Sequence, residues 1–286
     1  MSTELKVPKS VCWNITSRCN DNCEFCYREQ NQDELSLEQQ KIVINKVSKA
    51  GIKKLTFAGG EPLLLKHIND LVLYAKGCGL LVGVTSNGIL LDENVEEYKF
   101  LLENLNRLTF SLDGSNNGIQ AKMSRNESHA ARVLDLLEFA MLYDQKQCRM
   151  KLNTLVSKIN SNDILNIAAL VKKVRVERWK LFQFSPIRGN AIDYQIKFDI
   201  SDDEFKKVVN DVTEALREQE IIISESGRQD LESAYFVIFP NGEVRLSHET
   251  GESVLGNMLD DEVEAIWNQN KFHKVMHQER TIFLGY

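Results

Sequence analysis

Short runs rich in β-branched and aromatic residues alternate six times with longer amphipathic stretches along this chain. The runs predict strands, and the stretches between them, which carry apolar residues at helical spacing, predict helices. Parallel neighbouring strands need crossover connections, and helices of this length supply them, so the alternation predicts a parallel sheet. The expected strands are 11–16, 53–57, 81–85, 107–112, 149–156 and 178–184.

Helix and turn signals punctuate this pattern. Ser36-Leu37-Glu38-Gln39 and Ser201-Asp202-Asp203-Glu204 fit capping boxes, and Gly51 follows the first expected helix. Near the C-terminus, Pro240-Asn241-Gly242 separates two strand-like segments and predicts a hairpin. The other expected helices are 67–76, 93–102, 130–143 and 163–173.

Six strand–helix units are too few for the usual eight-stranded barrel. We therefore expect an α/β fold, namely an open partial (β/α)6 barrel with a C-terminal extension. The expected division is a core of residues 1–200 and an extension of residues 201–286.

The composition is that of a globular chain. It has 286 residues, 43% of them apolar and 27% charged, with a formal charge of −6. This excludes a disordered chain, and the acidic balance argues against coating nucleic acid by bulk charge. No apolar run approaches the roughly 18 residues that span a bilayer, and the first ten residues lack a signal-peptide core. Six Cys without a secretion signal predict a reduced, cytoplasmic protein, where clustered thiols usually serve a metal.

Three of the cysteines are clustered. Cys19, Cys23 and Cys26 form Cys-x3-Cys-x2-Cys directly after the first expected strand, so their thiolates can converge on one metal centre. A fourth ligand would close a zinc site, whereas three leave a position open for chemistry. A zinc knuckle with a distant fourth ligand is the alternative, but Cys78 and Cys148 have no partner at ligand spacing.

With Phe25 before the third cysteine, this spacing resembles the motif of the radical S-adenosylmethionine (radical SAM) superfamily. The context also matches, because the second expected strand leads into Ala58-Gly59-Gly60-Glu61-Pro62, which is similar to the superfamily's Gly-Gly-Glu-Pro. Glycines allow backbone to approach a ligand closely, and Glu61 offers an anionic acceptor to the methionine ammonium.

The resemblance implies that the three cysteines hold a [4Fe–4S] cluster whose unique iron chelates S-adenosylmethionine. One electron then cleaves the sulfonium and gives a 5′-deoxyadenosyl radical that abstracts a substrate hydrogen. Ser86, Asn87 and Ser111 end the third and fourth expected strands, where ligands bind in such folds, and are candidate cofactor contacts. The alternative is that they form turns and cap helices.

Cations recur on one face of several expected strands. Lys54 and Thr56 share a face of the second strand, Lys151 and Asn153 a face of the fifth, and Arg178 and Lys180 a face of the sixth. A strand covered on both faces would be almost wholly apolar. Four cations in one cavity need an anion, and a triphosphate suits them. Pairing with acids such as Glu177 is the alternative.

Four segments carry a resemblance to a known family: Gly51–Pro62, Lys151–Val156, Arg178–Gln183, and Glu225-Ser226 followed by Ser233-Ala234-Tyr235. In that order, over about residues 9–245, they resemble the viperin family. Viperin-like enzymes convert a nucleoside triphosphate, CTP in animals, to its 3′-deoxy-3′,4′-didehydro analogue, an antiviral RNA chain terminator. The hydrogen is abstracted from C4′ of the ribose, after which the 3′-hydroxyl leaves as water.

The viperin resemblance also implies roles for single residues. Lys54, Lys151, Arg178 and Lys180 would hold the triphosphate and sugar, and Asn153 would orient the nucleotide. Tyr235, from the extension, would close the nucleotide site or take part in a late electron or proton transfer. The lost hydroxyl needs a proton donor, either a lysine such as Lys151 or an ordered water.

Two departures from the animal pattern affect the substrate. Cys12 and Thr56 stand where the animal enzymes have Asn, so CTP is favoured but UTP or GTP is possible. Only about eight residues precede the first expected strand, so we expect no membrane helix of the animal type. The expected partners are the nucleotide and an electron donor such as flavodoxin or ferredoxin, without membrane or direct nucleic-acid binding.

Two other functions stay open. A radical SAM enzyme can modify a peptide or a pterin precursor, although no cysteine follows Cys148 to hold an auxiliary cluster. A non-catalytic iron–sulfur or zinc-binding module would bind metal without cleaving S-adenosylmethionine.

Overall fold

The computed structural model describes residues 6–92, 94–126, 128–231, 234–248, 251–269 and 271–282. Its internal contacts divide the chain into two compact units. The first unit contains Met1–Cys19, Glu29–Val84 and Gln229–Tyr286, and the second contains Asn20–Arg28 and Thr85–Arg228.

The first unit is built on a mixed sheet with strand order β10-β9-β8-β1-β2-β3. Strands β8, β1, β2 and β3 run parallel to one another, whereas β9 is antiparallel to β8 and β10 is antiparallel to β9. The strands are β1 (Ser10–Thr16), β2 (Lys54–Gly59), β3 (Leu81–Ser86, which ends in the second unit), β8 (Phe236–Ile238), β9 (Glu243–His248) and β10 (Gly251–Asn257).

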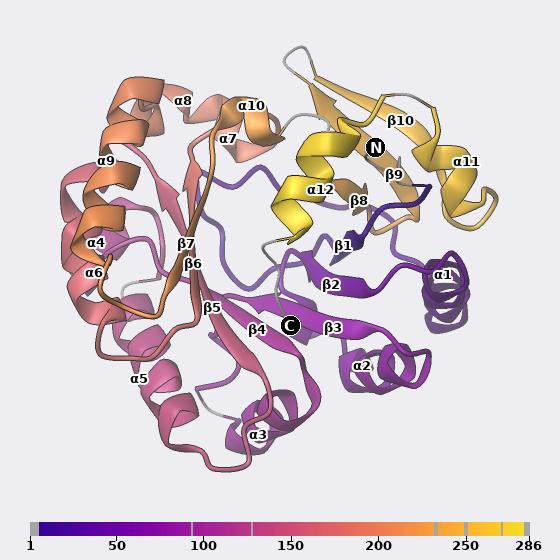
Figure 1. Ribbon diagram of the computed structural model, residues 1–286, viewed down its shortest axis with the longest axis horizontal. Coiled ribbons are helices and arrows are strands. Elements are labelled where there is room, and N and C mark those ends of the chain that lie inside the picture. The colour runs from indigo at the N-terminus through magenta and orange to yellow at the C-terminus, as the bar shows by residue number, and fades with distance from the viewer. Residues whose placement is uncertain are drawn as a thin grey trace. The chain divides into compact units, whose positions relative to one another are not determined.

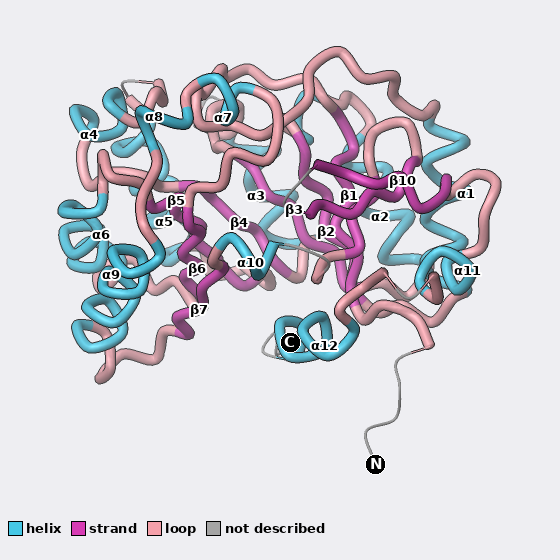
Figure 2. Tube along the Cα trace, turned by 90° about the horizontal axis from the view of Figure 1, so that it is seen from above, coloured by secondary structure: helices cyan, strands magenta, loops and turns pink. Residues whose placement is uncertain are grey.

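Helices α1 (Leu37–Lys49) and α2 (Ile68–Gly77) lie beside one another against β1–β3 (Figures 1 and 2). Helix α1 begins at the predicted capping box, in which the Ser36 hydroxyl accepts from the Gln39 N–H. The core beneath these helices holds fully buried Trp13, Leu55 and Phe57. The shorter elements are η1 (Pro62–Leu64), α11 (Val263–Trp267) and α12 (Lys274–Ile282), and α10 (Arg228–Leu231) links the units along the chain.

The second unit has four parallel strands in the order β4-β5-β6-β7. They are β4 (Arg107–Ser111), β5 (Arg149–Val156), β6 (Arg178–Gln183) and β7 (Ile222–Ser226). Figure 1 shows α5, α6 and α9 along one side of β5–β7. The helices and turns are α3 (Val95–Asn104), α4 (Asn117–Lys122), α5 (His129–Leu142), η2 (Ser161–Asp163), α6 (Ile164–Val171), α7 (Asn190–Asp193), α8 (Gln195–Phe198) and α9 (Asp202–Ala215).

The two faces of this second sheet differ in burial. One face carries the large apolar side chains, and these are at most 1% exposed. The opposite face alternates with it and is half-buried along β5 and β6. Burying the apolar set contributes about 1.5–3 kcal/mol for each large side chain and fixes which residues face the other way. The apolar set is Leu108, Phe110, Met150, Leu152, Trp179 and Leu181.

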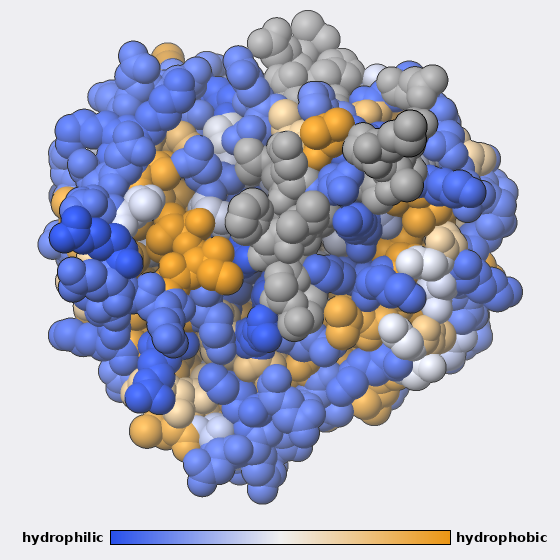
Figure 3. Space-filling model, in the orientation of Figure 1, coloured by the Kyte–Doolittle hydropathy of each residue, from blue (hydrophilic) through white to orange (hydrophobic). Residues whose placement is uncertain are grey.

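The open, parallel-dominated α/β sheet confirms the predicted fold class. All six predicted strands are present, and the hairpin at Pro240-Asn241-Gly242 joins β8 to β9. The sequence prediction missed two strands, β10 and the edge strand β7. An apolar surface lies over β7 (Figure 3), where Ile222 is 45% exposed. The division at residue 200 stays a prediction. Within the described residues, no helix combines the length and hydrophobicity needed to cross a membrane.

A buried histidine ties the last helix to the first strand. The ring of His277 accepts from the Lys9 backbone N–H at 3.0 Å through Nε2 and donates through Nδ1 to the Ala234 carbonyl at 2.8 Å. Because one ring nitrogen accepts and the other donates, the imidazole of His277 must be neutral. Burial lowers the pKa of His277.

We predict that His277 makes stability depend on pH. Because the pKa is lower in the folded state, its contribution is complete above the unfolded value of about 6.5 and declines as the pH falls toward the folded value. Urea denaturation at pH 7.5 and 5.5 measures this. His277→Gln should lose part of the dependence, whereas His273→Gln, at an exposed position, should keep it. Equal pH dependence in wild type and His277→Gln contradicts the prediction.

Candidate functional site

In the first unit, the segment before Cys19 packs against the Gly59-Gly60 turn. The Gly60 N–H donates to the Thr16 carbonyl and the Glu61 N–H to the Arg18 carbonyl, both at 2.8 Å. A Cβ at Gly60 would lie 1.9 Å from the Arg18 carbonyl oxygen, so no other residue fits. The sequence predicts that these glycines let backbone approach a ligand closely, and in the structure they also let the backbone that leads into Cys19 lie against the turn.

Glu61 is fully buried beside this turn. Its Oε1 accepts from the Leu63 N–H at 3.1 Å and caps η1. A carboxylate that is fixed in a buried position is suited to accept from a ligand ammonium.

In the second unit, Cys23 and Cys26 lie on one tight turn, in which the Cys26 N–H donates to the Cys23 carbonyl at 3.2 Å. Cys23 is buried, and its thiol donates to Asp21 at 3.2 Å. Cys26 Sγ accepts from the Arg28 N–H at 3.4 Å. In the described part of the chain, no three His, Cys, Asp or Glu side chains are gathered as ligands of one metal ion.

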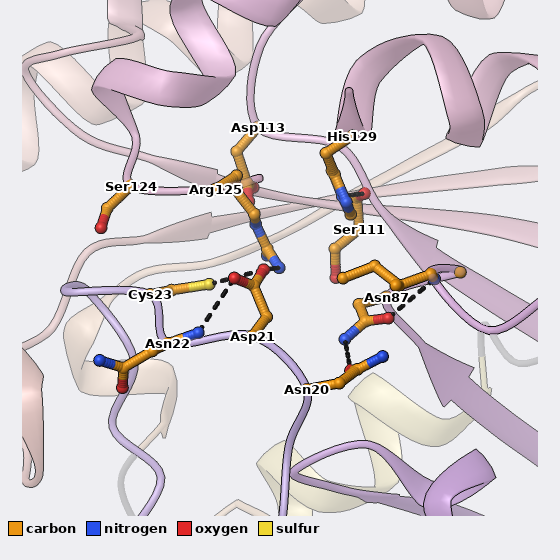
Figure 4. Close-up of polar contacts among 12 residues, drawn as sticks. Asn20, Asp21, Asn22, Cys23, Asn87, Ser111, Asp113, Ser124, Arg125 and His129 are labelled. Carbon is orange, nitrogen blue, oxygen red and sulfur yellow. Dashed lines mark hydrogen bonds and ion pairs between the residues drawn. The ribbon is translucent and has the colours of Figure 1, made fainter. Parts of the chain in front are cut away.

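Arg125 ties the cysteine turn to the end of β4 (Figure 4). Its Nη2 lies 2.7 Å from the Asp113 carboxylate, and its Nη1 lies 3.7 Å from that of Asp21. The guanidinium also covers the Phe25 ring at 4.9 Å. Burial disfavours its charge, but Cys23, Asp113 and Asp21 outweigh burial and raise the pKa of Arg125. Sequence reasoning missed this residue because no local pattern marks it.

Arg125 also acts on Cys23 electrostatically. Burial raises the pKa of the Cys23 thiol, and the positive charge of Arg125 opposes that rise. Metals bind the thiolate, so a buried cation beside Cys23 favours the form that a metal needs.

The three polar candidates at the strand ends make hydrogen bonds within the second unit. Ser86 Oγ accepts from the Gly88 N–H at 3.0 Å. Asn87 Oδ1 accepts from the Ile89 N–H at 2.9 Å, and Asn87 Nδ2 donates to Asn20 Oδ1 at 2.8 Å. The Ser111 carbonyl accepts from the ring of buried His129 at 2.9 Å (Figure 4). Asn87 therefore links the end of β3 to the segment that carries Cys23.

The predicted cations of the second unit lie side by side. Lys151 is in register with Arg178 on the next strand, and Asn153 with Lys180. Residues in register on parallel strands share a face, and neighbouring strands are about 4.8 Å apart. Arg178 is 4% exposed, whereas the other three are half-buried. The amide oxygen of Asn153 is buried and accepts no hydrogen bond from the described residues.

Two further arginines belong to the same face. Arg107 on β4 is in register with Arg149 on β5, two residues before Lys151. Arg107 is buried and Arg149 exposed. The period-two rule that identified Lys151 and Asn153 would also have found Arg149. We call Arg107, Arg149, Lys151, Arg178 and Lys180 the cationic face.

The remaining candidates belong to the first unit. Thr56 is in register with Cys12 on β1, which is in register with Val237 on β8. Lys54 and Tyr235 each lie two residues from this row, so all share one half-buried face of that sheet. The structure thus gathers the predicted substrate residues into two sets, one in each unit.

A protein-family model also matches this chain. The model described as the Radical SAM superfamily matches residues 13–171, more than half of the chain. The chain therefore belongs to the radical SAM superfamily.

Proteins of similar sequence show which family of the superfamily this chain belongs to. A protein of Flammeovirga pacifica, an S-adenosylmethionine-dependent nucleotide dehydratase, is 30% identical over 82% of this chain and 80% of its own length. A Lacinutrix mariniflava protein of the same name is 30% identical over 83% of this chain, which spans half of that longer protein. Within the superfamily, the chain belongs to the viperin family.

A solved structure supports the fold alone. The crystal structure of Streptococcus suis SuiB bound to S-adenosylmethionine aligns with a TM-score of 0.74, covering 96% of this chain and 68% of that one at 13% identity. A [4Fe–4S] cluster and S-adenosylmethionine are the cofactors characteristic of the superfamily. The cysteines of this chain fit these cofactors, because soft thiolates select iron–sulfur clusters and the charge of Arg125 favours the thiolate of Cys23.

We predict that Arg125 stabilises the second unit. Removing it leaves the carboxylate of Asp113, whose side chain is 1% exposed, without its cation, a change that typically costs 3–5 kcal/mol. Arg125→Met should lower the free energy of unfolding in urea by about 3 kcal/mol or more. Arg125→Lys, which keeps the positive charge, should lower it by less. The control is Arg132→Met, whose partner Asp92 is 45% exposed. A loss below about 1 kcal/mol would contradict the burial argument.

Proposed function

We propose that this chain is a radical SAM nucleotide dehydratase that converts a nucleoside triphosphate to its 3′-deoxy-3′,4′-didehydro analogue. CTP is the favoured substrate, with UTP or GTP as alternatives. The observation that carries the proposal is the cationic face of the second unit. Lys151 and Arg178 are in register on adjacent strands, and Lys180 lies two residues further along on the same face, so several cations line one side of this sheet.

Phosphate oxygens suit this face chemically. Charge-assisted hydrogen bonds from Lys and Arg to phosphate are short and strong, and each is worth about 1.5–3 kcal/mol. Lys151, Arg178 and Lys180 would bind the triphosphate. Lys54 and Thr56 are the substrate-binding candidates of the first unit. Asn153, whose buried amide oxygen accepts no hydrogen bond from the described residues and can therefore accept one from a ligand, would orient the nucleotide.

Cys19, Cys23 and Cys26 would hold the cluster. Gly59, Gly60, Glu61, Ser86, Asn87 and Ser111 would contact S-adenosylmethionine. When bound, these cofactors supply the 5′-deoxyadenosyl radical that removes hydrogen from C4′ of the ribose. Lys151 would donate the proton with which the 3′-hydroxyl leaves as water, and Tyr235 would close the site or transfer an electron or proton late.

We predict that Lys151→Ala and Lys180→Ala each lower nucleotide-dependent 5′-deoxyadenosine formation tenfold or more, since 1.4 kcal/mol is a factor of ten. Reactions with CTP, UTP, GTP, ATP and their monophosphates measure this, with triphosphates preferred by wild type. Slow cleavage of S-adenosylmethionine without substrate should survive in both variants. Lys151→Arg should retain more activity than Lys151→Ala.

Two controls accompany this experiment. Lys207→Ala removes a cation that is 77% exposed, and it should change nothing. Replacing Cys19, Cys23 and Cys26 together by Ala sets the background without cluster. Equal rates with triphosphate and monophosphate would contradict a triphosphate pocket and favour a peptide substrate.

A further inference from the structure

Strand β7 adds a serine to the face of the second sheet that carries the cations. Ser224 is in register with Lys180 on β6, and Lys180 is in register with Asn153 on β5. Asn153 is in turn in register with Ser111, which ends β4. Residues in register on parallel strands share a face, so these side chains form one line across β4–β7 (Figure 1). We call Ser111, Asn153, Lys180 and Ser224 the polar row.

Two members of the polar row carry buried oxygen atoms that no protein group satisfies. Ser224 Oγ and Asn153 Oδ1 are both buried, and neither forms a hydrogen bond with the described residues. Buried polar atoms in folded proteins are nearly always paired, so each such exception calls for a ligand or a bound water. Two exceptions in one row, with a single strand between them, indicate one ligand that reaches both.

The two buried oxygens decide which chemical group the row accepts. Phosphate oxygens are acceptors, so they cannot pair with Asn153 Oδ1, which is an acceptor itself. A hydroxyl both donates and accepts, and it can therefore satisfy Asn153 Oδ1 as well as the hydroxyl of Ser224. The polar row thus suits the hydroxyls of a sugar, whereas Lys151 and Arg178, which are in register one row earlier, suit phosphate.

The spacing along the strands fits a nucleotide that lies across these rows. Two residues of a strand span about 6.6 Å, so the polar row lies one such step from Lys151 and Arg178, toward the carboxyl ends of the strands. In a nucleoside triphosphate the ribose is joined to the phosphates through a single oxygen, and the base lies beyond the ribose. The group at the polar row is therefore the ribose. Ser111, assigned above to S-adenosylmethionine, belongs to the same row, which places the ribose beside the cofactor that acts on it.

The width of the polar row fits two neighbouring hydroxyls. Asn153 and Ser224 are separated by one strand, so their backbones are about 9.6 Å apart. Hydrogen bonds of about 2.8 Å from each side leave room for a pair of adjacent hydroxyls between them. Lys180 lies between the two residues, but its ammonium is over the Phe182 ring, 4.6 Å from the centroid and two residues further along β6. The ammonium therefore leans out of the row.

We propose that Ser224 binds the 2′-hydroxyl of the ribose and makes this chain select ribonucleotides over 2′-deoxyribonucleotides. The inference rests on the proposed function, in which Lys151 on β5 protonates the leaving 3′-hydroxyl. Asn153 lies two residues further along the same face of β5, so the 3′-hydroxyl belongs on the β5 side of the row. The adjacent 2′-hydroxyl then lies on the side of β7, where Ser224 is its partner.

The test measures the Kd of CTP and of 2′-deoxy-CTP by calorimetry, with the cluster-loaded protein and S-adenosylmethionine, without oxygen or reductant. UTP and GTP are each compared with their own 2′-deoxy counterpart in the same way. Wild type should bind the ribonucleotide about tenfold more tightly than the deoxyribonucleotide. Ser224→Ala should raise the Kd of the ribonucleotide about tenfold and leave that of the deoxyribonucleotide unchanged, so that the preference disappears. Ser224→Thr, which restores a hydroxyl, should keep the preference.

Two further variants serve as controls. Ser161→Ala removes the hydroxyl of a half-buried serine on η2 in the same unit, and it should leave every Kd unchanged. Asn153→Ala should weaken the binding of CTP but not that of 3′-deoxy-CTP, and it should keep the preference for the 2′-hydroxyl. The two hydroxyls of the ribose are thereby assigned to separate residues.

Equal Kd values for ribonucleotide and deoxyribonucleotide in wild type would overturn the inference, and so would a preference that persists in Ser224→Ala. If Ser224→Ala weakens both ligands equally, or neither, the serine only supports the sheet or holds a water, and the inference is wrong. If Ser224→Ala abolishes the preference but no nucleotide gives 5′-deoxyadenosine after reduction, the proposed function fails and the role of Ser224 stands. If both forms bind and react equally well, the proposed function stands and the role of Ser224 fails. A protein that binds none of these nucleotides contradicts both.

Discussion

The sidedness of the parallel sheet in the second unit is the constraint on which the site depends. Because Leu152 and Trp179 must be buried on one face, the period of two directs Lys151, Asn153, Arg178 and Lys180 to the other. A shift of one residue in either strand would bury cations under the helices. Core packing therefore fixes the position of the charges that we assign to the substrate.

The cysteine motif depends on two different kinds of support. On the Cys19 side, Gly59 and Gly60 let two backbones meet closely, which no side chain would permit. On the Cys23 side, Arg125 joins Asp21 to Asp113 and partly offsets the effect of burial on the Cys23 thiol. Backbone proximity fixes the first segment, and buried charge fixes the second.

Local patterns in the sequence predicted much of this arrangement. Alternation located six strands and the side on which Lys151 and Lys180 lie, because burial and period are local properties. The edge strand β7 was missed although Ile221-Ile222-Ile223 is a β-branched run. The contact of Arg125 with Asp113 and Asp21 could not be predicted, since an ion pair between separate loops leaves no periodic signal. The family motifs identified the cofactors, but only the register of β5 and β6 in the structure shows that Lys151 lies beside Arg178.

The most direct test of the proposed reaction follows one hydrogen atom. CTP, UTP and GTP that carry deuterium at C4′ of the ribose are incubated with the reduced, cluster-loaded protein, and the 5′-deoxyadenosine formed is examined by mass spectrometry. We expect deuterium in 5′-deoxyadenosine with at least one of these triphosphates, together with a nucleotide product that has lost the C4′ deuterium and the 3′-hydroxyl. Deoxyadenosine that contains no deuterium with any of them would contradict it.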